Sequence, residues 1–154
     1  MSLNVYLDGG FSIFKIAHIL ISITFLICAI WLFIRSFRGV FKEKPYYRID
    51  KLLSFGFIIT LYLQLIFGII LFSNLGSNTG YNYLSIDNTV KIVSKRLWPI
   101  EHIVLMLFAL LIANLGLIIS INTLSDKRKH WNIIIYYSIS LLLIIFSLGG
   151  IYLF

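Results

Sequence analysis

The sequence has little charge for its length: 12% of its 154 residues are Asp, Glu, Lys or Arg, whereas 60% are hydrophobic. Soluble domains contain about 25% charged and about 45–50% apolar residues. A single soluble core of this length has no room for such an excess of apolar side chains, because the fraction of surface that folding buries is limited by size. The composition therefore excludes an ordinary soluble domain and predicts an integral membrane protein.

Cysteine is also scarce, and its scarcity excludes two kinds of site. The one cysteine, Cys28, forms no intramolecular disulfide and leaves no Cys-based metal spacing such as CxxC. We interpret it as a small apolar packing residue. The N-terminal segment lacks the basic start and the cleavage site of a signal peptide, so we expect the first apolar run to be a retained helix. No repeat or second domain is visible, and residues 1–154 are predicted to form a single integral membrane domain.

Four apolar runs are long enough to cross a bilayer, which needs about 20 helical residues. They cover approximately residues 11–34, 52–72, 97–121 and 131–154. Helices are expected because a spanning segment has to satisfy its backbone hydrogen bonds internally. The alternating polarity of transmembrane strands is absent. The predicted fold is an all-α, four-helix transmembrane bundle.

The basic residues are distributed unevenly between the two ends of this bundle. Nine lie in the two short connections: Arg35, Arg38, Lys42, Lys44, Arg48, Lys51, Lys127, Arg128 and Lys129. Four lie on the opposite side: Lys15, Lys91, Lys95 and Arg96. The positive-inside rule places the short connections in the cytoplasm and both termini on the outer, periplasmic side. The net charge of +7 then reflects this bias and anionic lipid headgroups, and it requires no nucleic-acid partner.

The long connection contains a stretch with the pattern of a surface helix, residues 85–96. Ser85 is placed to cap it, and basic residues near its end complement the helix dipole. Ile86, Val90 and Val93 share one face, so we expect this helix to lie in the membrane interface.

Two histidines lie inside the apolar runs at similar predicted depths. His18 is about 10 Å inside the first run and His102 about 8 Å inside the third, at a rise of about 1.5 Å per residue. Both runs begin on the outer side in the predicted orientation. The sequence therefore predicts that the two imidazoles lie at one level and face the same interior space.

Small or polar residues accompany each histidine at helical spacing. From His102 the stripe runs through Met106, Ala109, Ala113, Gly116 and Ser120, and from His18 it runs through Ser22, Phe25, Ala29 and Leu32. In the second run the stripe is Gly56, Thr60, Gln64 and Gly68. Small residues mark where membrane helices approach each other or a flat ligand. The stripes predict that both histidines face the bundle interior.

Two interior imidazoles are typical axial ligands of a b-type haem. In this hypothesis His18 and His102 bind the iron, Met106 lines the slot, and Arg96, with Lys95 beside it, meets the haem propionates. Zinc fits less well, because it takes three or four protein ligands. Glu101 is adjacent to His102 and so points about 100° away around the helix.

Simpler interpretations exist for each polar residue. An isolated histidine near a membrane interface is commonly a hydrogen-bonded packing residue. Glu101 follows Pro99 closely, where an acid stabilises a helix N-terminus, so we predict that it supports the start of the third helix. Gln64 is expected to make an interhelical hydrogen bond, as is Asn114, and Tyr62 is ambiguous. His130, beside a basic run, is interpreted as an interfacial residue.

Several segments resemble a family of small four-span bacterial membrane proteins labelled cytochrome b or cytochrome b-like. The resemblance covers most of the chain and is carried by KPYYRIDKLLSF, LYLQLIFGIILF, RLWPIEHIVLMLFALLIANLG and AHILISITFLI. Its most specific pieces are Lys44-Pro45 with Asp50, and Glu101-His102 with Met106. It implies a haem-binding bundle in the bacterial cytoplasmic (inner) membrane, with His18 and His102 at the histidine positions of the family.

The chain departs from that family pattern at two positions. Tyr62 stands where members carry a histidine before Leu-Gln-Leu, and Ser22 where an arginine is often found. The first difference argues against a second haem and against transmembrane electron transfer by this chain alone.

The resulting prediction is a haem b protein that exchanges electrons with a redox partner or a quinone. One alternative is a non-catalytic accessory subunit of a larger membrane complex. Another is a bundle that binds a quinone or other lipophilic small molecule, with Arg96, Glu101 and the histidines at its polar head. The sequence contains no pattern of a nucleophile or a general acid–base pair, so no enzymatic reaction is predicted.

Overall fold

The computed structural model describes residues 3–78 and 90–153, and it describes the side-chain surroundings of residues 13–73 and 100–148. This part of the chain forms four helices: α1 (Leu3–Phe41), α2 (Arg48–Asn78), α3 (Val90–Asn122) and α4 (Asp126–Leu153). Each contains a segment long and apolar enough to cross a membrane: Ile13–Phe41, Arg48–Ser73, Ile100–Asn122 and Asp126–Leu148. The predicted all-helical architecture with four such spans is confirmed.

The helices are longer than the apolar runs from which they were predicted. Residues 90–96, predicted as part of a surface helix, continue without a break into α3, while residues 85–89 lie outside the described part of the chain. Glu101 is therefore about three turns inside α3 rather than in its first turn. The prediction that Glu101 supports the helix N-terminus is wrong, because the unpaired N–H groups belong to the turn that begins at Val90.

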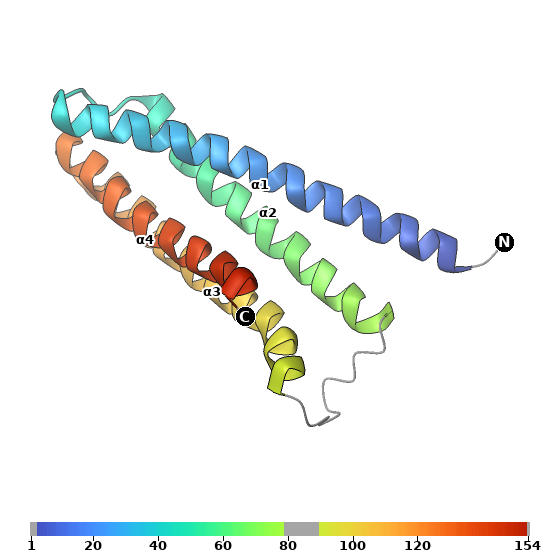
Figure 1. Ribbon diagram of the computed structural model, residues 1–154. Helices are drawn as coiled ribbons and strands as arrows, with labels where there is room; N and C mark the ends of the chain where they lie inside the picture. The colour runs from blue at the N-terminus through green and yellow to red at the C-terminus, as the bar shows by residue number, and fades with distance from the viewer. Residues whose placement is uncertain (1–2, 79–89, 154) are drawn as a thin grey trace.

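The helices pack as two antiparallel hairpins, α1 with α2 and α3 with α4 (Figure 1). The hairpins meet at the end that carries the short connections, residues 42–47 and 123–125, which we call the loop end. They diverge toward the opposite end, which carries His18 and His102 and which we call the histidine end (Figure 1). The described chain thus has a closely joined end and a splayed end.

The core follows the line where the hairpins meet. Phe57 of α2 is fully buried between Phe25 of α1, at a ring-centroid distance of 4.7 Å, and Tyr137 of α4, at 4.6 Å. The outward faces of the four helices carry exposed Ile, Leu and Phe side chains along their length. Such extensive apolar exposure suits contact with lipid rather than with water.

Local signals terminate the helices at the loop end. The amide of Lys44 donates to the carbonyl of Gly39 (3.1 Å), and Glu43 has a positive φ of 48°. This is a Schellman motif with Glu43 in the left-handed position. At the start of α2, the Asp50 carboxylate accepts a hydrogen bond from the Tyr47 amide at 2.9 Å, as in a capping box.

Candidate functional site

The histidine end brings one polar or small residue from each helix to a common level. His18 lies on α1 and His102 on α3, so each hairpin contributes one histidine. On α2, a Cβ at Gly68 would lie 3.8 Å from Cε1 of His18, which is ordinary van der Waals contact. On α4, Ser147 contacts the His102 ring. Each imidazole is therefore packed against the partner helix of its own hairpin.

His102 is oriented by a hydrogen bond from the neighbouring helix. Its Nδ1 lies 2.5 Å from Oγ of Ser147, which is 4% exposed. No sequence pattern predicts the contact with Ser147, which lies 45 residues away in the chain. A hydrogen bond at Nδ1 fixes the orientation of the ring, as is usual for a metal-binding histidine.

His18 is half-buried, and its Nδ1 atom is buried with no hydrogen-bond partner among the described residues. Its backbone is fixed instead: the His18 carbonyl accepts hydrogen bonds from Oγ of Ser22 (2.9 Å) and Nε2 of Gln64 (3.2 Å). Gln64 also donates to Ser22 at 2.5 Å. Gln64 is 5% exposed, and it joins α2 to α1 directly beside His18, in agreement with its predicted interhelical role.

The small-residue stripes face the interior as predicted. Met106, one turn beyond His102, is 6% exposed, and Ala109, Ala113 and Ser120 are fully buried. On α1 the stripe includes Phe25, Ala29 and Leu32, which are all buried. Met106 therefore lies on the same interior face of α3 as the His102 ring.

The other predicted site residues are less closely associated with this level. Glu101 and Tyr62 are exposed, and the Tyr62 hydroxyl accepts a 3.4 Å hydrogen bond from Asn114 on α3. Arg96 belongs to α3, but its side chain lies outside the described residues, as does that of Lys95. Among the described residues, no three His, Cys, Asp or Glu side chains gather where they could hold a metal ion. This argues against a zinc site in that part of the chain, whereas axial haem ligation needs only two imidazoles.

The loop end contains a second polar cluster that the sequence analysis missed. Asp50 is 1% exposed, and its carboxylate accepts hydrogen bonds from Nε (2.5 Å) and Nη2 (3.2 Å) of Arg35. Ser54 donates to the Asp50 carbonyl at 2.8 Å, and its own carbonyl accepts the hydroxyl of Tyr137 at 3.3 Å. These contacts connect α1, α2 and α4.

His130 lies in the same cluster and is only 1% exposed. The interpretation of His130 as an interfacial residue stays a prediction, and the structure adds that its ring is buried because the first turns of α4 pack against α1 and the 42–47 connection. The ring fills the space left by Gly39, where a Cβ would collide with it, and it lies edge-on to Tyr46 at 5.1 Å. Burial in this contact raises the pKa of the Tyr46 hydroxyl. A glycine at position 39 and the Lys44-Pro45 motif were the only sequence signals of this packing.

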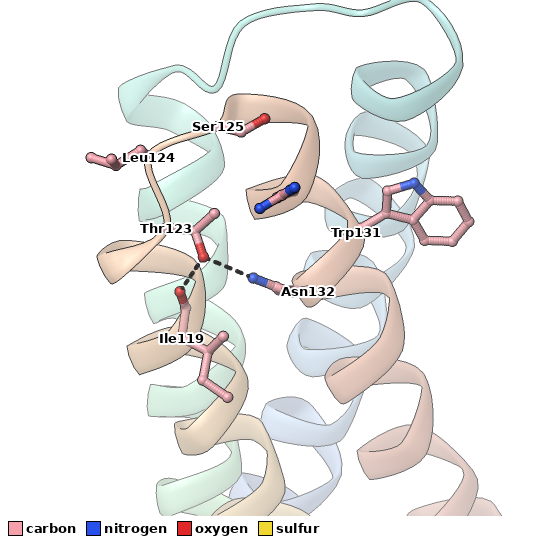
Figure 2. A pocket seen from close by; sticks show the side chains of 7 residues that line it. Ile119, Thr123, Leu124, Ser125, Trp131 and Asn132 are labelled. Carbon is pink, nitrogen blue, oxygen red and sulfur yellow. Dashed lines mark hydrogen bonds between the residues drawn. The ribbon is translucent and has the colours of Figure 1, made fainter.

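A larger, open hollow of about 480 Å³ lies beside the connection between α3 and α4 (Figure 2). Two of its polar side chains are paired with each other: Thr123 donates to the Ile119 carbonyl at 2.7 Å and accepts from Asn132 at 3.1 Å. Leu124 and Trp131 extend away from these hydrogen bonds (Figure 2) and are 98% and 41% exposed. The hollow therefore has an apolar rim, and its hydrogen-bonded Thr123 and Asn132 are not directed at a common ligand position.

Comparison with protein-family models, with curated proteins and with solved structures finds no match to this chain. The function is therefore inferred from the residues and their contacts.

Proposed function

We propose that the protein is a multi-pass membrane protein that binds one haem b at the histidine end, with His18 and His102 as axial ligands, and exchanges electrons with a partner. The observation that carries the proposal is the position of two half-buried imidazoles, one on each hairpin, at the same end of the bundle. The haem, when bound, supplies a one-electron redox couple.

The side chains around the two rings fit such a group. His18 is half-buried at the histidine end, where its backbone is held by Ser22 and Gln64. Ser147 would hold the orientation of the His102 ring through its Nδ1 atom. Gly68 brings the α2 backbone close to the His18 ring, and Met106 lines the interior of α3. Arg96 is proposed to pair with the propionates.

The electron-transfer partner is proposed to be a quinone or a redox protein, or a larger membrane complex that contains this chain. A single haem near one surface is suited to exchange with a partner on that side. The absence of a histidine at position 62 leaves the chain without a second pair of interior histidines for transfer across the bilayer.

The experiment is an absorption spectrum of the protein purified in a mild detergent, oxidised and after dithionite reduction. A Soret band is expected, with reduced α and β bands of a six-coordinate b-type haem. His18→Ala and His102→Ala are each expected to abolish the band while far-UV circular dichroism remains helical. Glu101→Gln is the matched control, because Glu101 adjoins His102 but is exposed, and it should keep the haem content of the wild type.

Two outcomes would contradict parts of this proposal. If Glu101→Gln removes the haem as completely as His102→Ala, the acid belongs to the site. If wild-type protein purified with haem supplied during expression has no Soret band, the chain is better explained as an accessory subunit, or as a bundle for a lipophilic small molecule.

We also propose that the loop end faces the cytoplasm and the histidine end faces the periplasm, in the bacterial inner membrane. The support is the nine-to-four excess of Lys and Arg at the loop end. Single cysteines at positions 42, 78 and 128, in a Cys28→Ser background, provide the test in intact cells. An impermeant maleimide should label position 78 only, and labelling at positions 42 and 128 but not at 78 would reverse the orientation.

A further inference from the structure

A small cavity at the loop end has the composition of an anion site. It is lined by Arg35, Arg38, Lys44, Pro45, Tyr47, Asp50 and His130. Three cationic side chains in this lining outnumber its single carboxylate, so the cavity is positively charged. It lies at the level where α1 ends and α2 begins, which is where membrane helices usually meet lipid headgroups.

The Asp50 carboxylate does not compete for the cavity's other cations, because it is engaged by Arg35 and by the Tyr47 amide. The side chains of Arg38 and Lys44 have no ion-pair or hydrogen-bond partner within the described ranges 13–73 and 100–148. Two cationic groups are therefore directed to the same small space without a counter-charge.

His130 provides an independent indication of a ligand. It is 1% exposed, and neither Nδ1 nor Nε2 forms a well-directed hydrogen bond among the described residues, although backbone groups of Lys44 and Pro45 lie near the ring. Native proteins seldom leave buried polar atoms unpaired, since each costs about the desolvation of one hydrogen-bonding group. An acceptor in the cavity would receive an N–H from this ring.

The size of the cavity limits what can bind there. Its volume of about 70 Å³ corresponds to roughly five waters at about 10–15 Å³ each. A phosphate group is of this size, whereas a haem or a quinone ring is too large. Arginine and lysine are also the residues that proteins use to bind phosphate.

We propose that this cavity binds a phosphate group, held by Arg38, Lys44 and Arg35 with an N–H of His130. The phosphate belongs either to a phospholipid headgroup at the cytoplasmic surface or to a free phosphate or phosphomonoester in solution. The site lies at the opposite end of the bundle from the histidine pair and does not depend on haem.

The test uses the full chain, purified in dodecyl maltoside and depleted of phospholipid. In one arm, inorganic phosphate is titrated by isothermal titration calorimetry. In the other arm, native mass spectrometry counts bound phosphatidic acid, with diacylglycerol of the same chain length as the phosphate-free comparison. Saturable binding of one phosphatidic acid alone assigns the site to a headgroup, and binding of inorganic phosphate that displaces the lipid assigns it to a soluble phosphate.

Two pairs of exposed basic residues make matched variants, because only one member of each pair lines the cavity. Lys44→Gln should weaken phosphate binding about fivefold, and Arg38→Gln about tenfold, as each removes one charge-assisted hydrogen bond. Lys42→Gln and Arg48→Gln, outside the cavity, should leave it unchanged. The proposal is overturned if neither inorganic phosphate nor phosphatidic acid binds. It is also overturned if the control variants weaken binding as much as the cavity variants, because the general positive charge of the surface would then explain the binding.

Discussion

The two ends of the bundle place histidine in opposite environments. At the loop end, His130 is sealed under the 42–47 connection beside an Arg–Asp ion pair that joins α1 to α2. At the histidine end, His18 and His102 are half-buried between hairpins that diverge (Figure 1). The loop end encloses a small cavity, whereas at the histidine end each ring packs within its own hairpin. The phosphate that we propose at the loop end and the haem that we propose at the histidine end match this difference in space.

The largest expected effect is the loss of the buried carboxylate at the loop end. Asp50→Ala would leave Arg35 without its partner and remove an acceptor from the Tyr47 amide, at a cost of about 3 kcal/mol, the low end for breaking a buried pair because Arg35 is 30% exposed. Equilibrium unfolding in mixed micelles with increasing SDS measures this loss. An unchanged midpoint would mean that the loop end is not the more stable end.

A pair of glycine substitutions compares the packing of the two ends directly. Gly39→Ala should destabilise the protein by about 1–3 kcal/mol, because the new methyl group would collide with the His130 ring. Gly68→Ala places its methyl group at ordinary contact distance from His18. It should be neutral or stabilise by up to about 1 kcal/mol, since alanine loses less backbone entropy in a helix. Equal costs in the same SDS titration would contradict the contrast in packing.

Ser147→Ala tests the orientation of His102 without removing the ligand. Loss of the hydrogen bond to Nδ1 should weaken haem retention roughly 10-fold to 100-fold and shift the reduction potential. Spectroscopic redox titration and haem transfer to an acceptor protein measure the two quantities. Ser140→Ala, which removes a buried hydrogen bond to the Ala109 carbonyl (2.8 Å) elsewhere on α4, is the control. It should cost about 1 kcal/mol of stability and leave the potential unchanged.

The smallest effect is expected from the exposed ion pair between the 42–47 connection and the first turn of α4. Lys127 donates to Glu43 at 2.8 Å and lowers the pKa of that carboxyl below its ordinary value of 4.5. Stability from the pair is therefore present above pH 4.5 and is lost as the pH falls through the lowered pKa. The melting temperature of Glu43→Gln should be slightly lower than that of the wild type at pH 7. At pH 3 the two melting temperatures should be equal. A large difference at pH 7 would mean that the connections, rather than the buried cluster, hold the loop end together.

The number and type of helices were predictable, because a backbone that crosses lipid has to form its hydrogen bonds within its own segment. The runs at 11–34, 52–72, 97–121 and 131–154 each lie within, or nearly coincide with, a helix of the structure. Helix ends were less predictable, since helices continue beyond the apolar part. The Glu101 prediction failed for this reason: Pro99 was interpreted as the start of a helix that begins at Val90.

The sequence by itself determined the four helices, the basic loop end and the interior faces of the stripes, because hydropathy and helical period act along a single chain. Only the tertiary structure decided which residues meet: Ser147 with His102, Gln64 with the His18 carbonyl, and Arg35 with Asp50. Partners in different helices depend on helix rotation and on how the hairpins converge, and no local pattern encodes either. His130 became a buried residue for the same reason, since its burial is produced by Gly39 of α1 and the 42–47 connection rather than by its neighbours in sequence.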